Sequence, residues 1–390
     1  MILGILLSVY VPNSSKAFEG AQIIGVSVPL AIGLIVMMIP PLCKVEWENF
    51  FTFFSRTKYL RPIIISLVLN WIICPFLMFG LAWMTLFAHD EYRTGIIMIG
   101  LARCIAMVLL WNDIALGDNT LCAVIVLINS LLQVVLYAPY QLFFCYVITG
   151  DHSNIDAGLS YPLVAKSVAF FLGVPLGFGV VIRFMSLWIL GRKKYESKLL
   201  PWIAPWALIG LLYTIVVIFI AKGHEFIKEI RSALLCFIPL IIYFTVTWFG
   251  TFFLLRWISK PTTPQSDETH ATPRTSEDES KQSLLCGCEE KIEKNPHKWQ
   301  KGCSANYAET ITQTFTAASN NFELSLAVAI SLYGSGSKQA IAATFGPLLE
   351  VPILLILAFL ARYFRVKFIW SDVDDNEEEE EEREVMVDTE

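Results

Sequence analysis

The sequence predicts an all-α polytopic membrane protein with about ten transmembrane helices in two inverted five-helix repeats. The 390 residues are 55% hydrophobic and only 16% charged, with a mean hydropathy of +0.57, which excludes an ordinary soluble domain. Nine apolar stretches approach the roughly 20 residues that a helix needs to cross the hydrocarbon core. In addition, short segments of the first half recur in the second half in the same order.

The predicted crossings follow one another along the chain. Residues 1–11 are apolar but only half long enough, so we interpret them as the end of a truncated first helix. The nine other crossings are expected at residues 23–43, 62–87, 95–111, 121–147, 164–190, 202–221, 233–255, 311–333 and 340–360.

Four parts of the chain follow from this assignment. Residues 1–257 hold transmembrane helices 1 to 8, and residues 309–370 hold helices 9 and 10. Between them, residues 258–308 form a cytosolic loop rich in Pro, Ser, Thr and charged residues, which is expected to be disordered because it cannot bury enough apolar surface to fold. Residues 371–390 form an acidic cytosolic tail.

Basic residues orient the predicted bundle, because Lys and Arg accumulate in cytoplasmic loops. If the chain has ten crossings and both termini lie in the cytosol, sixteen Lys and Arg residues fall in the inner loops and six in the outer loops. We therefore expect a multi-pass protein of the plasma membrane with both termini inside. Lys166 and Arg183 are interpreted as snorkelling side chains near helix ends.

Two pairs of similar segments indicate the repeat. Segment 28–33 resembles segment 204–210 when the two are aligned at their prolines. Segments 130–136 and 347–353 form a second pair, which is separated by more residues than the first pair. The loop 258–308 lies between the members of the second pair only, so an insertion there explains the larger separation. Since five helices per half is an odd number, the second half enters from the opposite side. Inverted repeats of this kind enclose a midplane site between interrupted helices, here the fourth and ninth crossings.

The fourth crossing carries Arg103 and Cys104 in an otherwise apolar segment. A charge near the bilayer centre costs roughly 3 kcal/mol, so it normally faces a partner or a water-filled path. On a continuous helix Cys104, Met107, Trp111 and Asn112 would share one face, which predicts a binding stripe with Arg103 beside it. The alternative is a packed stripe in which Met fills gaps and Cys acts as a small hydrophobe.

The ninth crossing carries Asn320, Asn321 and Glu323, a polar run that would be unstable against lipid and is expected to line a cavity. The larger of the two repeat offsets places Asn321 opposite Cys104. Glu323 has two interpretations: a permanent ion pair with Arg103, or a group that takes and releases a proton in each cycle.

Supporting polar groups are expected elsewhere in the bundle. Asn70 lies in the middle of the third crossing, and Glu350 in the tenth occupies the repeat position of Gln133. Both are interpreted as caps of broken-helix backbone. The segment from Gly334 to Lys338 lacks the spacing of a phosphate-binding loop, so an ion gradient is the expected energy source. Nothing in the sequence indicates an enzyme, a cofactor or a nucleic-acid partner.

Four motifs in order carry a family resemblance: residues 95–108, Trp111-Asn112, 314–325 and 346–352. Together they resemble the fungal-type arsenical-resistance arsenite efflux permeases of the bile-acid/sodium symporter-like superfamily. The resemblance covers almost the whole chain. It implies a ten-helix antiporter that expels trivalent arsenic, in some members also antimony, in exchange for protons. It also implies that Cys104 and Glu323 are the family's essential cysteine and glutamate.

The chemistry of the cargo agrees with this resemblance. Arsenite at neutral pH is mostly an uncharged trihydroxide, and its condensation with a thiol releases water without a change of net charge. Soft sulfur suits the soft arsenic centre, and a single thiol captures it weakly enough for release. Arg103, Trp111 and Asn112 are expected to complete the substrate site around Cys104, with Glu323 coupling it to protons.

Two alternatives stay open from the residues alone. One is a sodium-coupled symporter of organic anions, with the polar run of the ninth crossing as the sodium site. The other is a non-transporting membrane sensor of metalloids that uses the tail and the cysteines of the loop 258–308, which are Cys286, Cys288 and Cys303.

Overall fold

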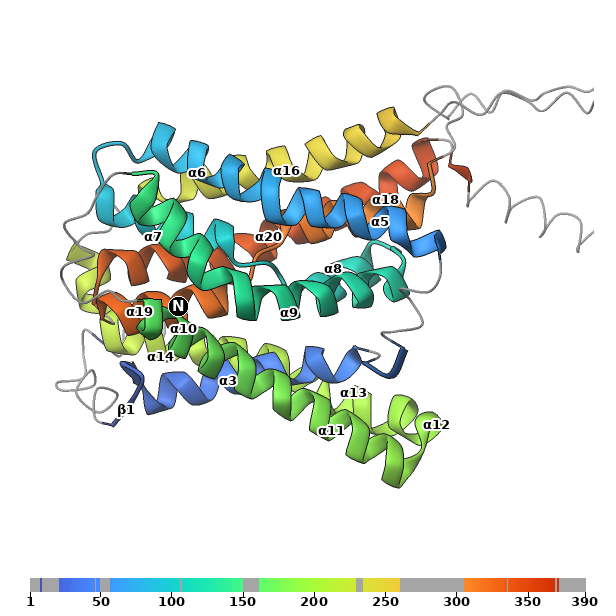
Figure 1. Ribbon diagram of the computed structural model, residues 1–390, viewed down its shortest axis with the longest axis horizontal. Coiled ribbons are helices and arrows are strands. Elements are labelled where there is room, and N and C mark those ends of the chain that lie inside the picture. The colour runs from blue at the N-terminus through green and yellow to red at the C-terminus, as the bar shows by residue number, and fades with distance from the viewer. Residues whose placement is uncertain are drawn as a thin grey trace, which may run out of the picture.

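The computed structural model (Figure 1) is a bundle of helices that run in both directions along one long axis. It describes residue 8 and residues 21–45, 47–49, 57–105, 107–149, 161–228, 234–259, 305–334, 336–368 and 370–371. The predicted first crossing at residues 1–11 and the acidic tail lie outside the described residues, apart from residues 8 and 371, as does most of the loop 258–308. The count of ten crossings, the loop and the tail therefore stay predictions.

The elements of the first half are β1 (Gln22–Ile23), β2 (Val26–Ser27), α3 (Val28–Lys44), the 3-10 turn η1 (Trp47–Asn49), α5 (Thr57–Val68), the π-helical turn η2 (Leu69–Ile73), α6 (Cys74–Thr85), α7 (Asp90–Leu101), α8 (Met107–Ile114), α9 (Asn119–Leu142) and the π-helical turn η3 (Phe143–Val147).

The elements of the second half are α10 (Tyr161–Val168), the π-helical turn η4 (Ala169–Gly173), α11 (Val174–Leu190), α12 (Arg192–Lys194), the π-helical turn η5 (Tyr195–Leu199), α13 (Leu200–Ile203), α14 (Pro205–Lys228), α16 (Phe237–Ile258), α18 (Tyr307–Ala318), α19 (Phe322–Tyr333) and α20 (Lys338–Lys367).

The helices confirm an all-α membrane protein. Among the described residues, six continuous helical segments are long and apolar enough to span a bilayer: Leu60–Thr85, Asn119–Val147, Tyr161–Leu190, Arg192–Ala221, Phe237–Ile258 and Lys338–Lys367. Helix α3 is shorter, at 17 residues. The two remaining crossings are interrupted, one between α7 and α8 and one between α18 and α19, where the sequence predicts the fourth and ninth crossings to break.

The start of α3 differs from the sequence prediction. A helix was expected from residue 23, but β1 and β2 form a two-stranded antiparallel hairpin there, and α3 begins at Val28. Gly25 occupies the left-handed region at φ +77°, which closes the hairpin turn, and Pro29 lies in the first turn of α3.

The first pair of repeat segments meets in space, because α3 packs against α14. A Cβ atom on Gly33 of α3 would press against Tyr213 and Thr214, and one on Gly210 of α14 would press against Met37. The two glycines thus occupy reciprocal places in one interface. The two segments that the sequence pairs are therefore direct neighbours in the bundle.

The bundle consists of two bodies. Helices α3, α11 and α14, with the short α12, η5 and α13, pack on one another and are called the α3 body. The crossing body comprises α5 to α9, α16 and α18 to α20, and contains both interrupted crossings. The α3 body also includes α10, which continues through η4 into α11, and the hairpin of β1 and β2, which packs on α3. Helix α10 contacts both α9 and α19 of the crossing body. We call the end at which α3 finishes and α9 begins the inner end, and the opposite end the outer end (Figure 1).

Candidate functional site

The two interrupted crossings meet at their breaks. Arg103, between α7 and α8, forms an antiparallel bridge with Asn320, between α18 and α19. The backbone N–H of Asn321 donates to the carbonyl of Ala102 at 3.0 Å. A helix break leaves backbone groups without intrahelical partners, and here each break supplies some of the partners for the other.

Each break is also held by a side chain from the next helix of its own half. Gln133 of α9 accepts a hydrogen bond from the backbone N–H of Arg103 through Oε1, at 2.5 Å. Glu350 of α20 accepts one from the hydroxyl of Ser319. The larger repeat offset relates both Gln133 to Glu350 and Arg103 to Asn320. The repeat thus extends to the capping side chains.

Arg103 is fully buried at the crossing. Its Nη2 atom donates to Oδ1 of Asn320 at 2.7 Å and to the carbonyl of Gly100, and its Nη1 atom donates to the hydroxyl of Tyr243 on α16 at 3.3 Å. In the part of the chain that the structure describes, no ion pair joins Arg103 to Glu323. The interpretation of Glu323 as a permanent partner of Arg103 is therefore wrong, because the guanidinium points to Asn320 and Tyr243.

Cys104 lies in the extended break and is 3% exposed. The expectation that Cys104, Met107, Trp111 and Asn112 share one helix face is wrong, because α8 begins only at Met107. The thiol instead lies in the interaction range of the Ser319 hydroxyl and of the Val108 backbone N–H.

Two carboxyl groups from the second half lie within electrostatic range of the Cys104 thiol, and the influence of Glu350 is stronger than that of Glu323. Glu323 lies in the first turn of α19, which Asn321 caps by accepting from the backbone N–H of Leu324 at 3.0 Å. Both glutamates are buried: Glu350 is 2% exposed and Glu323 is 7% exposed. The break of the first half therefore presents the thiol, and the second half presents the acid groups.

The structure places the other predicted site residues at different depths. Asn112 lies at the inner end, where Nδ2 donates to Oδ1 of Asn119 at 2.7 Å and Oδ1 accepts from the hydroxyl of Thr312 at 2.8 Å. Both ends of its amide are thus used to join α8, α9 and α18 away from Cys104. Met107 and Trp111 are buried on α8. Asn70 lies in η2, where Nδ2 donates to the carbonyl of Ser66 at 2.9 Å.

Several buried polar atoms at the crossing have no protein partner among the described residues: Nε of Arg103, Nδ2 of Asn320, Nδ2 of Asn321 and Nε2 of Gln133. Buried donors of this kind are usually satisfied by water or a ligand. The described residues contain no cluster of three or more His, Cys, Asp or Glu side chains arranged to hold a resident metal ion.

Sequence reasoning missed two contributors to this site. Tyr243 lies in the eighth crossing, which no matched segment aligned with the first half, and its hydroxyl also donates to the carbonyl of Ala317. Ser319 directly precedes the polar run of the ninth crossing in the sequence. Its hydroxyl donates to Glu350 and lies in the interaction range of Cys104, which gives it a place at the thiol.

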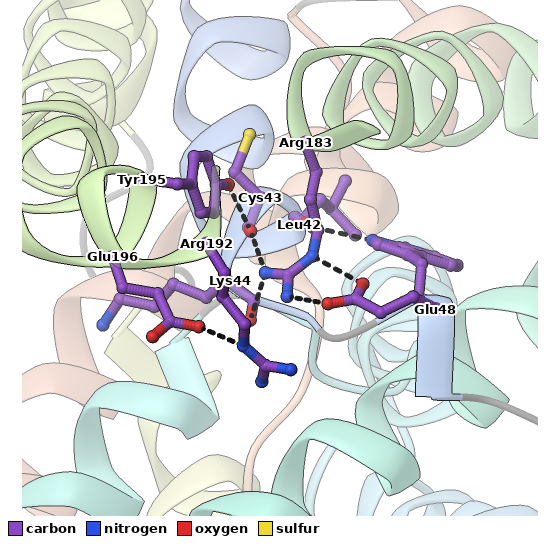
Figure 2. A network of polar contacts seen from close by, with 9 residues as sticks. Leu42, Cys43, Lys44, Glu48, Arg183, Arg192, Tyr195 and Glu196 are labelled. Atoms are coloured by element: carbon purple, nitrogen blue, oxygen red, sulfur yellow. Dashed lines mark hydrogen bonds and ion pairs between the residues drawn. The ribbon is translucent and has the colours of Figure 1, made fainter. Parts of the chain in front are cut away.

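The prediction for Arg183 is wrong, since its side chain does not snorkel but is buried at the inner end (Figure 2). It forms a bidentate ion pair with Glu48, with N–O distances of 2.9 Å from Nε and 2.6 Å from Nη2. Nη1 also donates to the carbonyls of Cys43 and Lys44 at the end of α3. Partial burial raises the pKa of Glu48, but the hydrogen bonds and charge of Arg183 outweigh this and hold the pKa below its usual value.

These features define a membrane protein built from inverted repeats whose broken helices cross at a buried polar site, which is the architecture of a secondary transporter. Residues 31–229 match the Sodium Bile acid symporter family. The chain is also 37% identical over 374 residues to the arsenical-resistance protein Acr3 of Corynebacterium glutamicum, which covers 95% of this chain and 88% of that protein. The chain belongs to the sodium/bile acid symporter family and, within it, to the Acr3 arsenical-resistance group.

Two more distant relatives are also similar to most of this chain. The arsenical-resistance protein Acr3 of Alkaliphilus metalliredigens is 25% identical over 91% of this chain and 86% of its own length. An uncharacterized transporter of Synechocystis is 27% identical over 93% of this chain and 85% of its own length. The similarity to each covers most of the length of both chains.

Proposed function

We propose that this protein expels trivalent arsenic, as arsenite, from the cytosol in exchange for protons and so confers resistance to arsenic. Antimonite, the heavier trivalent analogue, is the second expected cargo. The protein works in the plasma membrane with both termini in the cytosol. The observation that carries the proposal is the buried Cys104 thiol at the crossing of the two broken helices, within electrostatic range of Glu350 and Glu323.

Capture of the cargo is a condensation at sulfur. A sulfur–arsenic bond forms between Cys104 and arsenite, one arsenic–oxygen bond breaks, and the departing hydroxyl leaves as water with the proton of the thiol. Sulfur is the soft ligand that the soft arsenic centre prefers. Cys74 also lies at the crossing, but its thiol donates to the carbonyl of Ala317. In this step arsenic bonds to Cys104 alone, and a single sulfur–arsenic bond is weak enough to reverse on the other side.

Ser319 is positioned to carry the proton of the thiol. Its hydroxyl donates to Glu350 and lies in the interaction range of Cys104. The proton passes from the thiol through Ser319 to Glu350 as sulfur attacks, and returns to the leaving hydroxyl. Such proton transfer by a positioned side chain speeds a reaction by about 100-fold or more.

Glu323 couples the cycle to protons. It lies at the N-terminus of α19, and its carboxyl group lies within electrostatic range of the same thiol. A proton that arrives from outside neutralises Glu323 and so changes the net charge at the crossing. This change favours release of arsenic to the outside and return of the empty site to the cytosolic side. One arsenite thus leaves as protons enter.

The proposal is tested by counterflow of radiolabelled arsenite in everted vesicles with an imposed pH gradient. Cys104→Ser should abolish uptake into the vesicles, while the matched variant Cys236→Ser, at a buried cysteine directly before α16, should transport normally. Size-exclusion profiles establish that both variants are folded. Normal pumping by Cys104→Ser, or uptake that ignores the pH gradient, contradicts the proposal.

A second candidate function is sodium-coupled import of an organic anion, and the membership in a sodium symporter family favours it. In that case Asn320, Asn321 and Glu323 would coordinate sodium through their side-chain oxygens. Replacing sodium with choline separates the two functions: the arsenite antiporter keeps its full rate, and the sodium symporter stops.

A further inference from the structure

The outer ends of the two bodies are in direct contact. Helix α10 packs against α19 and α9, and the hydroxyls of Ser167 and Ser331 lie 2.7 Å apart. On the hairpin of the α3 body, a Cβ atom added to Gly25 would lie 3.2 Å from the backbone of Ser331. At the outer end the two bodies therefore pack so closely that a methyl group in place of the Gly25 hydrogen would be crowded.

The inner ends are joined differently. Lys44, the last residue of α3, forms an ion pair with Asp113 of α8, with 3.8 Å between Nζ and Oδ2. The two side chains are 34% and 44% exposed. A cavity of about 160 Å³ lies beside the pair, between Lys44 and Val45 on one side and the face of α9 that carries Asn119, Thr120 and Ala123 on the other.

Each charge of this pair is fixed to its own body. The carbonyls of Cys43 and Lys44 accept from Arg183, and the carbonyl of Cys43 also accepts from the hydroxyl of Tyr195 at 2.8 Å (Figure 2). These contacts hold the end of α3 within the α3 body.

On the other side, Asp113 follows Asn112, whose amide is bonded to Asn119 and Thr312 within the crossing body. The last turn of α8 therefore moves with α9 and α18. The distance between Lys44 and Asp113 thus depends on the separation of the two bodies at the inner end.

We propose that Lys44 and Asp113 form the inner gate of the transport path. The pair links the bodies while Cys104 is closed to the cytosol, and it separates when the neighbouring cavity widens to admit cargo. Half-exposed ion pairs are weak, because water solvates the charges when they part. The pair can therefore open repeatedly, as a gate must. This inference rests on the proposed transport function and on the inner end facing the cytosol.

Accessibility of the cavity tests the gate without any arsenite. Ala123→Cys places a thiol in the cavity, in a background where the cysteines of the loop 258–308 are replaced by Ser. A membrane-impermeant maleimide is applied to inside-out vesicles. Adding Lys44→Gln or Asp113→Asn should speed labelling of position 123 about two- to fivefold, which is the effect of losing one exposed ion pair.

Two controls separate gating from general damage. The charge swap Lys44→Asp with Asp113→Lys should return labelling to the parent rate, because it restores the pair. Glu196→Gln removes an exposed ion pair with Arg192 that lies within the α3 body, so it should leave the rate unchanged.

The gate is refuted if the single variants label at the parent rate, if Glu196→Gln accelerates labelling equally, or if the swap fails to restore the rate. Because no arsenite is present, these outcomes concern the gate alone. A negative result in the arsenite counterflow experiment would instead refute the proposal that arsenite is the cargo.

Discussion

At the scale of single residues, the site depends on which groups face the Cys104 thiol. A mostly apolar crossing with one cysteine and one arginine allows two arrangements, with the arginine either near the acid groups or away from them. The structure has Arg103 bonded to Asn320 and Tyr243, while Glu323 and Glu350 lie within electrostatic range of the thiol. Arg103 therefore holds the crossing together, and the proposed proton chemistry falls to the two carboxyl groups.

The two capping side chains should differ in what they do. Glu350→Gln keeps an acceptor oxygen for Ser319 but cannot take a proton, so we expect a thermal midpoint close to that of the parent and transport reduced by about 100-fold or more. Vesicle counterflow and thermal unfolding in detergent measure the two quantities. Transport at the parent rate would remove Glu350 from the proton path.

The equivalent position in the first half should be structural. Gln133→Ala leaves the buried N–H of Arg103 without its acceptor, which should cost about 1–3 kcal/mol of stability. A lower unfolding temperature in detergent is the expected result. An unchanged unfolding temperature would show that water replaces Gln133 at no cost.

The Glu48–Arg183 pair gives a pH dependence with a defined sign. Because the folded-state pKa of Glu48 is held below its ordinary value of 4.5, the pair contributes stability above that pH and loses it as the pH falls below 4.5. The unfolding temperature of the parent should therefore fall more steeply below pH 4.5 than that of Glu48→Gln. Parallel curves for the two proteins would contradict this assignment.

At the scale of helices, the breaks depend on partners that are distant in the chain. The inverted repeat predicted that the fourth and ninth crossings, which are the polar ones, are interrupted. It did not predict that Cys104 leaves the helix, because the residues from Gly100 to Asn112 can all continue one. The break is stabilised by Asn320 and Asn321, which belong to the other half of the chain, and single-sequence periodicity carries no information about such contacts.

Close packing of α19 on α20 should be sensitive to one carbon atom. A Cβ atom on Gly346 of α20 would overlap the ring of Phe322, the first residue of α19. Gly346→Ala should therefore destabilise the protein by about 1–3 kcal/mol and slow transport, because α19 carries Glu323. Gly250→Ala on α16 is the matched control, since nothing lies within 4 Å of its added carbon. If both variants unfold at the same temperature, this contact is not tight.

At the scale of the whole molecule, the inverted repeat was the most informative prediction from the sequence. Two offsets, read from short apolar segments, correspond in the structure to the α3–α14 interface and to the paired caps of the crossing. The division into two bodies was not predictable in the same way. It depends on which helix faces pack together, and both lipid-facing and protein-facing surfaces are apolar in a membrane.

The orientation of the molecule follows from the basic residues and is open to a direct test. Lys193 on α12 lies at the inner end, and Glu91 on α7 lies at the outer end. A cysteine introduced at position 193 should react with an impermeant maleimide in inside-out vesicles, and one at position 91 in right-side-out vesicles. The reverse pattern would invert the predicted topology and the direction of transport.

The central claim is that arsenic binds the Cys104 thiol at the crossing of the two halves. Alkylation of individual cysteines, followed by mass spectrometry of inside-out vesicles with and without arsenite, tests it most directly. Arsenite should slow alkylation of Cys104 and leave alkylation of Cys236 unchanged. Alkylation of Cys104 at the same rate in the presence and absence of arsenite, in protein that still transports, would contradict it.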